Sequence, residues 1–233
     1  VNTSGQAVEL SPYGLINRTF EGEVSKTLIL HEGPLAVVND TLEEPSYNDL
    51  VKDGSKRYGE AKGWLGITDK YWLTALIPHN DEPFTGKFES KVSANGYHHY
   101  QADFMGRSRE IAPGQTVDYT SLVFAGAKQL EMLDSYAEKY NIPLFDRAVD
   151  LGNLYFLTKP LLKLLTLLYA VSGDFGMAII LLTFLVKLAM YPLANKSYVA
   201  MNEMKRLQPK ITQLKERYGD DKMRFQQEMM GLY

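Results

Sequence analysis

The feature that most constrains this chain is an apolar run of nineteen residues from Phe175 to Leu193, FGMAIILLTFLVKLAMYPL. As a helix rising about 1.5 Å per residue the run covers about 28 Å, close to the bilayer's hydrocarbon core of about 30 Å. It predicts a transmembrane helix over residues 174–193. One cation, Lys187, lies inside the run, and a charge within lipid needs a physical reason.

Charge is divided unevenly on the two sides of this run. Residues 1–150 hold 14 basic and 22 acidic side chains, whereas residues 194–233 hold 8 basic and 5 acidic ones. Short cytoplasmic segments beside a membrane helix carry an excess of Lys and Arg. We therefore predict that residues 194–233 are cytoplasmic and that residues 1–150 are exported.

The chain contains no cysteine. An exported domain without cysteine has no disulfides and depends on its hydrophobic core alone. The same absence excludes Cys-based zinc sites and Cys nucleophiles. The sequence opens on a polar stretch without an apolar leader, and because an exported domain needs an export signal, we expect the chain to be a fragment.

Residues 1–126 are predicted to form short antiparallel strands separated by turns. KVSANGYHHYQADF predicts a hairpin, because Asn95-Gly96 supplies the positive φ angles of a tight turn. KTLILHEGPLAVVND predicts two strands around a turn at residues 32–34, and YWLTALIP predicts one strand that ends at Pro78. In IAPGQTVDYTSLVF, a turn at Pro113-Gly114 precedes a strand that alternates over Val117, Tyr119, Ser121 and Val123. Such a series is typical of an antiparallel sandwich.

Helical periodicity begins near Ala127. Apolar residues then recur at helical spacing before Asn141-Ile142-Pro143. Residues 127–150 are therefore predicted to form a closing helix and a linker. The apolar positions of the helix are Leu130, Leu133, Tyr136, Ala137 and Tyr140.

Residues 151–173 contain a second apolar segment, LYFLTKPLLKLLTLLYA. Its polar residues Lys159, Lys163 and Thr166 share one narrow helical face, which favours a helix in the membrane interface with its lysines toward the headgroups. Alternatively the segment also spans the membrane, forming a hairpin around residues 172–174. The charge asymmetry and Pro160 favour the interfacial helix.

Beyond Leu193 the predicted helix becomes amphipathic. Gly219-Asp220-Asp221 predicts a helix end followed by a new helix cap. Residues 194–233 are thus predicted to form a truncated helical hairpin. Its first apolar face consists of Tyr198, Met201, Met204, Leu207, Ile211 and Leu214.

Two physical explanations fit Lys187. Its flexible stem can reach the cytoplasmic headgroups, or its ammonium group can face a water-filled recess between helices. Thr183 precedes it by four residues and therefore shares its helical face.

The segment from Leu181 onward, LLTFLVKLAMYPLANKSYVAMNEMKRLQPKITQLKERYGDDKMRFQQEMMGLY, resembles the first conserved transmembrane helix and the cytoplasmic hairpin of the YidC membrane-protein insertases. The motifs MYPL, LQPKI, RYGDDK and QEMMGLY follow that family's order and spacing. Upstream, NTSGQAVELSPYGLI, IPHND and the PGQ turn resemble the second part of the periplasmic domain of Gram-negative members. TKPLLKLL falls at the family's interfacial helix, so the resemblance covers nearly the whole chain.

The resemblance implies a fold and a groove. It implies a partial β-supersandwich in the periplasm, followed by an interfacial helix, one of the family's five core membrane helices and a cytoplasmic hairpin. It places Lys187 and Thr183 in a hydrophilic groove that receives the incoming chain. Many Gram-negative relatives carry arginine at that position. Lysine keeps the charge but loses the planar fork for carboxylate, so a field effect survives but a guanidinium-specific mechanism does not.

The resemblance also implies partners. They are nascent membrane proteins, the Sec translocon (SecYEG and SecDF), ribosomes, signal-recognition targeting factors and lipids of the bacterial inner membrane. For the contacts of the hairpin it points to Tyr191, Tyr198, Lys215 and Asp220. Read without the resemblance, these are interfacial tyrosines, a solvated charge and a helix cap.

Two other classes remain open, a membrane-anchored carbohydrate-binding sandwich and a single-pass structural or signalling protein. His79 in IPHND fits the former class or, more simply, a turn. His98 and His99 point to opposite faces of one strand, so they cannot share a metal. We find no phosphate-binding loop, nucleophile elbow or HExxH motif. We therefore expect no enzyme activity, cofactor, metal or sequence-specific nucleic-acid binding.

Overall fold

The computed structural model describes residues 1–20, 30–79, 82–94, 96–152 and 154–218, with two further positions, 223 and 226. The chain forms two compact units, Val1–Asn153 and Leu154–Tyr233. The first unit is mainly β and the second is helical.

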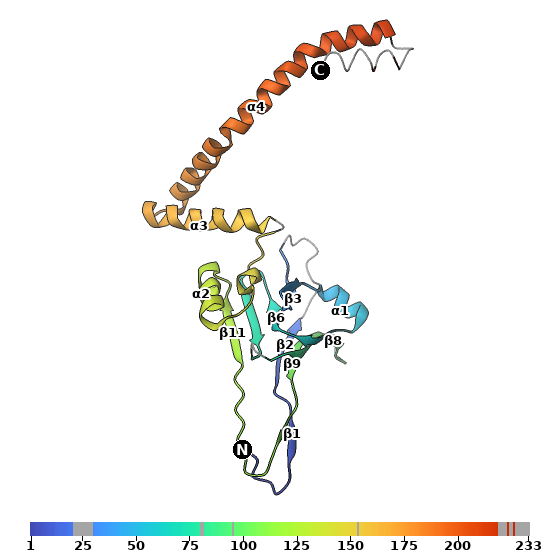
Figure 1. Ribbon diagram of the computed structural model, residues 1–233, viewed down its shortest axis with the longest axis vertical. Coiled ribbons are helices and arrows are strands. Elements are labelled where there is room, and N and C mark those ends of the chain that lie inside the picture. Colours follow the sequence, from blue (N-terminus) through green and yellow to red (C-terminus); the bar gives the residue numbers. More distant parts are fainter. Residues whose placement is uncertain are drawn as a thin grey trace. The chain divides into compact units, whose positions relative to one another are not determined.

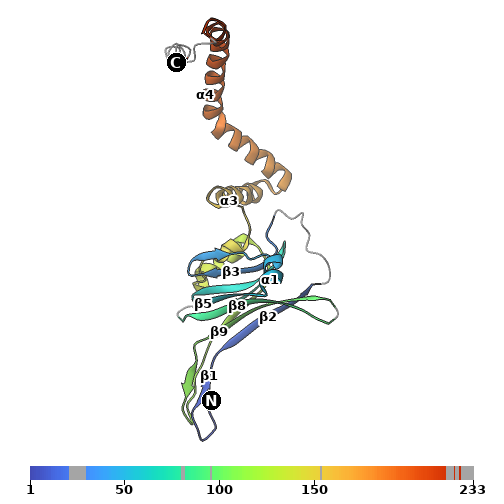
Figure 2. The ribbon, with the colours of Figure 1, turned by 90° about the vertical axis from the view of Figure 1, so that its right-hand side faces the viewer.

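Unit 1 contains three antiparallel sheets within its described residues (Figures 1 and 2). The larger sheet has the order β11 (Leu122–Ala127), β7 (Trp72–Ile77), β6 (Gly63–Thr68), β3 (Gly33–Val38) and β4 (Thr41–Glu43). The second sheet has the order β2 (Tyr13–Phe20), β9 (His98–Gly106), β8 (Phe84–Val92) and β5 (Ser55–Ala61). β1 (Val8–Leu10) and β10 (Arg109–Ile111) form a two-stranded arm.

The two larger sheets pack face to face around a hydrophobic core, which confirms the predicted antiparallel sandwich. Phe88 and Phe104 from the four-stranded sheet meet Leu65 and Leu76 from the five-stranded sheet. Helix α1 (Tyr47–Asp53) adds Tyr47 and Leu50 to the same core. Side chains alternate between this core and the opposite face along β8, as a one-sided antiparallel sheet requires.

A second core covers the other face of the five-stranded sheet. Helix α2 (Leu130–Tyr140) and the 3₁₀ helix η1 (Phe145–Ala148) pack there. The Trp64 indole N–H donates to the Pro143 carbonyl over 2.9 Å, and its ring meets Phe145 edge to face. The predicted helix before Asn141 is confirmed, and its covering explains why β6 is buried on both faces.

The predicted hairpin at Asn95-Gly96 is confirmed through its described residues. Val92 pairs with His98, and Gly96 has a φ of 82°. The turn expected at residues 32–34 is wrong, because β3 already begins at Gly33, which pairs with Thr68 of β6. The strand expected before that turn lies mostly outside the described residues.

The predicted alternation over residues 117–123 is wrong in its second half. The β-ladder begins only at Leu122, which pairs with Ile77, and Val123 is 65% exposed. Val117 and Tyr119 are half-buried, but Thr120 and Ser121 are both exposed. The alternation therefore slips by one residue, and Leu122 and Phe124 turn toward α2 instead.

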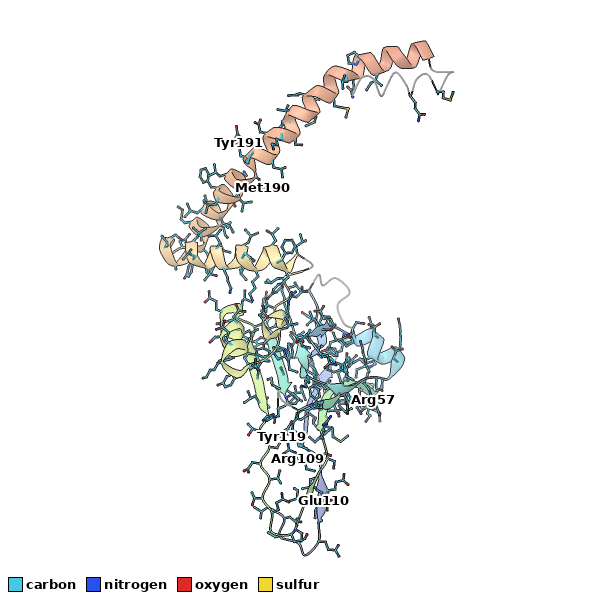
Figure 3. All side chains as sticks on the ribbon, viewed as in Figure 1. Arg57, Arg109, Glu110, Tyr119, Met190 and Tyr191 are labelled. Atoms are coloured by element: carbon cyan, nitrogen blue, oxygen red, sulfur yellow. The ribbon has the colours of Figure 1, made fainter. Side chains whose placement is uncertain are left out.

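Contacts at the base of the β1–β10 arm hold the Tyr119 side chain in place. The Tyr119 hydroxyl accepts a hydrogen bond from the His79 backbone N–H over 3.1 Å. The guanidinium carbon of Arg109 lies 5.7 Å from the centre of the Tyr119 ring (Figure 3), and Arg109 also pairs with Glu82. These contacts hold Tyr119 at the base of the arm, although residues 112–121 form no β-ladder.

Unit 2 contains two long helices, α3 (Tyr155–Ser172) and α4 (Phe175–Tyr218). Gly173 ends α3 in the left-handed conformation with a φ of 72°. The Asp174 carboxylate accepts the Met177 N–H over 2.9 Å, which caps the start of α4. The rings of Tyr169 and Phe175 stack across this joint with 4.1 Å between centroids. Most of the predicted second arm of the hairpin lies outside the described residues.

Candidate functional site in the apolar helix

Helix α4 carries the segment that can cross a membrane. Among the described residues it is the one helix long and apolar enough, over Phe175–Val199. Within this segment only Ala178 is buried and only Leu182 is half-buried. The core helix of a soluble protein would bury one face. The exposed apolar surface of α4 therefore suits lipid or further membrane helices.

Lys187 lies twelve residues after Phe175 and six residues before Leu193, the two ends of the apolar run. Its side chain is exposed, and within the described part of the chain it forms no ion pair. Thr183, one turn earlier, donates its hydroxyl to the Ile179 carbonyl over 2.8 Å. That bond satisfies the Thr183 hydroxyl hydrogen and leaves its oxygen able to accept a hydrogen bond.

The continuity of α4 brings four predicted site residues to one face. At about 100° per residue, Thr183, Lys187, Tyr191 and Tyr198 fall within an arc of about 80°. Tyr191 and Tyr198 are 68% and 63% exposed, and Figure 3 shows Tyr191 projecting from the helix beside Met190. We call Thr183, Lys187, Tyr191 and Tyr198 the polar face of α4.

Pro192 adds a polar group that the sequence reasoning missed. Proline lies inside α4 and has no N–H, so the Leu188 carbonyl lacks its usual donor within the helix. An unpaired carbonyl in hydrocarbon costs several kcal/mol. The proline in MYPL was the available signal for this group.

The other predicted contact residues of the cytoplasmic part have less structural detail. The backbone of Lys215 belongs to α4, but its side chain is outside what the structure describes. Asp220, the predicted cap, also lies outside the described residues.

The two lysines predicted to face headgroups both lie on α3. Lys159 and Lys163 are one turn apart, and the Lys159 ammonium nitrogen lies 5.6 Å from the centre of the Tyr155 ring. The hydroxyl of Thr166, on the same side, donates to the Leu162 carbonyl over 3.1 Å. Pro160 sits within the helix without ending it. This arrangement is compatible with an interfacial helix, whose place in a membrane stays a prediction.

The histidines occupy structural positions. The ring of His98 stacks on Tyr100, and Nδ1 of His99 lies 2.9 Å from the Thr19 hydroxyl. His79 anchors Tyr119 through its backbone, and its neighbours Asn80 and Asp81 lie outside the described residues. In the parts of the chain that the structure describes, no three His, Asp or Glu side chains gather as a metal site would require.

Comparison with known proteins identifies the family. Residues 1–164 match the family described as the YidC periplasmic domain, and residues 167–233 match the family described as the 60Kd inner membrane protein. Proteins named membrane protein insertase YidC from Rickettsia bellii and Rickettsia canadensis are each 42% identical over 234 residues. The alignments cover 100% of this chain but 42% of each relative. The chain therefore belongs to the YidC family of inner membrane proteins.

Proposed function

We propose that this chain is the part of a membrane protein insertase and chaperone that supplies the first wall of a hydrated groove. Unit 1 lies in the periplasm, α3 lies in the outer interface, and α4 crosses to the cytoplasm. The polar face of α4 receives hydrophilic parts of nascent membrane proteins. The observation that carries the proposal is a cation, Lys187, within the apolar run Phe175–Leu193 of an exposed helix, with Thr183 on the same face.

Lys187 lies six residues before Leu193, about 9 Å inside the cytoplasmic end of the apolar run, which is within snorkelling reach of the headgroups. The second polar side chain on its face, Thr183, favours a wet recess, because two polar groups on one face are better evidence than one. A lysine at the bilayer midplane costs roughly 2.5–3.5 kcal/mol, and at the depth of Lys187 the cost should be smaller. Water beside the polar face would remove much of this cost and would also solvate the Leu188 carbonyl.

The proposed groove works by an electrostatic field, without covalent chemistry. A fixed positive charge in a medium of low dielectric attracts acidic residues of a segment that is crossing the membrane. The wet recess also shortens the hydrocarbon path of that segment. Because no bond is made or broken in this mechanism, we propose that the protein is not an enzyme.

We propose that the protein acts alone on some substrates and together with the Sec translocon, SecYEG and SecDF, on others. The amphipathic continuation of α4, which is rich in Lys and Arg, is proposed to contact ribosomes and targeting factors. Tyr191, at the cytoplasmic end of the apolar run, and Tyr198, beyond it, are exposed and are proposed to contribute to these contacts where the polar face of α4 leaves the membrane.

Charge reversal at Lys187 tests the groove in the full-length protein. Lys187→Glu should impair insertion of a Sec-independent substrate at least tenfold in rate, about 1.4 kcal/mol, whereas Lys187→Arg should retain activity because it keeps the charge. Lys196→Glu is the matched control, since Lys196 is exposed on the opposite side of α4. The measurement is protease protection of the inserted substrate in proteoliposomes. Equal activity of Lys187→Glu and Lys187→Arg would refute the role of the charge.

Crosslinking separates this function from a simple membrane anchor. A photoreactive group at position 183 should capture a nascent chain if the polar face lines a groove. Capture of lipid alone would favour a single-pass anchor. A carbohydrate-binding sandwich would instead show glycan binding that is lost on substitution of His79.

A further inference from the structure

One end of unit 1 presents two large aromatic side chains to solvent. Tyr71 and Trp72, at the turn between β6 and β7, are 64% and 61% exposed. The Asp69 N–H donates to the Trp72 carbonyl over 2.8 Å and closes this turn. The Lys70 ammonium nitrogen lies 5.1 Å from the centre of the Tyr71 ring. We call Lys70, Tyr71 and Trp72 the aromatic tip.

The aromatic tip lies at the end of unit 1 from which the chain leaves. The Lys128 N–H donates to the Tyr71 carbonyl over 2.9 Å, and Thr68 at the other side of the turn pairs with Gly33. Two residues before Gly33, the His31 N–H donates to the Asp150 carboxylate over 3.1 Å. A short series of direct contacts thus connects the aromatic tip to Asp150.

The covalent chain limits how far this end can lie from α3. Four residues lie between Asp150 and Tyr155, where α3 begins, and the five residue-to-residue steps span at most about 18 Å when extended. If α3 lies in the membrane interface, the chain is therefore short enough to let the end of unit 1 that holds Asp150 reach the same interface. The β1–β10 arm lies at the opposite end of the sheets from the aromatic tip. The chain runs from β10 into β11 at Leu122, which pairs with Ile77, whereas Trp72 pairs with Ala127 at the other end of β11.

Tyr and Trp suit this location because each has an apolar ring and a polar tip, and both are enriched at membrane–water interfaces. Electrostatic attraction to anionic lipid would not explain the contact. Lys128 lies among the carboxylates of Asp150, Asp69, Glu32 and Glu44, so this end of the unit is not basic. The aromatic rings, rather than net positive charge, would supply the binding.

We propose that the aromatic tip inserts Tyr71 and Trp72 into the headgroup region of the outer leaflet and so holds unit 1 against the membrane. The proposed partner is a phospholipid bilayer, including one without net charge. The proposal rests on the topology given above, in which unit 1 is periplasmic and α3 is interfacial. It adds a second membrane contact, supplied by the β domain itself.

Fluorescence quenching of Trp72 tests this contact in the full-length protein reconstituted into neutral phosphatidylcholine vesicles. The difference between the native protein and Trp72→Phe isolates the Trp72 emission. This emission should lose most of its intensity in vesicles of phosphatidylcholine brominated near the top of its acyl chains. It should respond weakly to aqueous iodide, and added salt should not change the bromolipid quenching.

A second reporter separates failure of this proposal from failure of the topology. Leu167 is 61% exposed on α3, so the additional emission of Leu167→Trp reports the depth of that helix. If bromolipid quenches position 167 while iodide alone quenches Trp72, the aromatic tip is in water and the proposal is overturned although the topology stands. If neither position meets lipid, both are overturned. If neither quencher reaches Trp72, protein covers it, which also overturns the proposal.

Discussion

The two tryptophans of the chain show how one residue type serves two purposes. Trp64 is fully buried and donates its indole N–H to the Pro143 carbonyl, whereas Trp72 is 61% exposed. The burial of Trp64 joins the five-stranded sheet to the segment between α2 and η1. The sequence shows both as large aromatic residues, but it cannot tell which one a later segment of chain covers.

Replacing each tryptophan by phenylalanine should separate these purposes. Trp64→Phe removes a buried hydrogen bond and part of a ring, so we expect a loss of about 1–3 kcal/mol in the free energy of unfolding of unit 1. Trp72→Phe, the matched control, should change it by less than about 0.5 kcal/mol. Urea unfolding followed by circular dichroism measures both. A loss for Trp72→Phe as large as that for Trp64→Phe would show that the exposed ring is structural.

The polar face of α4 was only partly predictable residue by residue. The i, i+4 spacing of Thr183 and Lys187 predicts a shared face because helix geometry is local. Tyr191 follows eight residues after Thr183 on the same face, whereas adding Tyr198 requires the helix to continue through Pro192, where proline would ordinarily break or kink it.

At the scale of elements, long periodic segments were predictable and short ones were not. The sandwich, the helix ending at Tyr140 and the hairpin at Gly96 follow from patterns that local chemistry determines. The one-residue shift of the buried positions after Tyr119 does not follow from local chemistry, because the Tyr119 hydroxyl is held by the backbone N–H of His79, forty residues earlier. Helix α1 was missed, although its Ser46-x-x-Asp49 spacing is the usual signature of a helix start.

The cap of α1 makes a testable contribution. The Ser46 hydroxyl accepts the Asp49 N–H over 3.1 Å, and the Asp49 carboxylate accepts the Ser46 N–H over 3.1 Å. Since α1 delivers Tyr47 and Leu50 to the core, Ser46→Ala should lower the free energy of unfolding by about 1 kcal/mol. Asn48→Ala, at an exposed position of α1, is the control and should not destabilise the unit. Urea unfolding again provides the measurement, and equal effects of the two changes would contradict the capping role.

The same cap predicts a dependence on pH. Hydrogen bonds from Ser46 lower the pKa of Asp49 below its ordinary value of 3.8. A carboxyl whose pKa falls on folding stabilises the folded state above its unfolded pKa, and this stabilisation is lost as the pH falls through the folded value. The difference between Ser46→Ala and the native chain should therefore be largest near neutral pH and should shrink in acid.

At the scale of the whole molecule, the distribution of charge and the single candidate span among the described helices favour one crossing, with unit 1 outside. A single helix provides one wall of a groove, and the chain spans 42% of the length of the relatives it matches. The groove is therefore a property proposed for the full-length protein, in which further helices would face the polar face of α4. Unit 1 would add the aromatic tip as a contact with the same bilayer.

Water at position 187 is the central claim, and cysteine reactivity measures it most directly. In the full-length protein freed of other cysteines, Lys187→Cys should react with a small water-soluble maleimide added from the cytoplasmic side. Leu185→Cys lies at nearly the same depth on the opposite side of α4, so it should be at least about tenfold slower, because a thiol in hydrocarbon stays protonated. Equal, slow labelling at both positions would contradict the account.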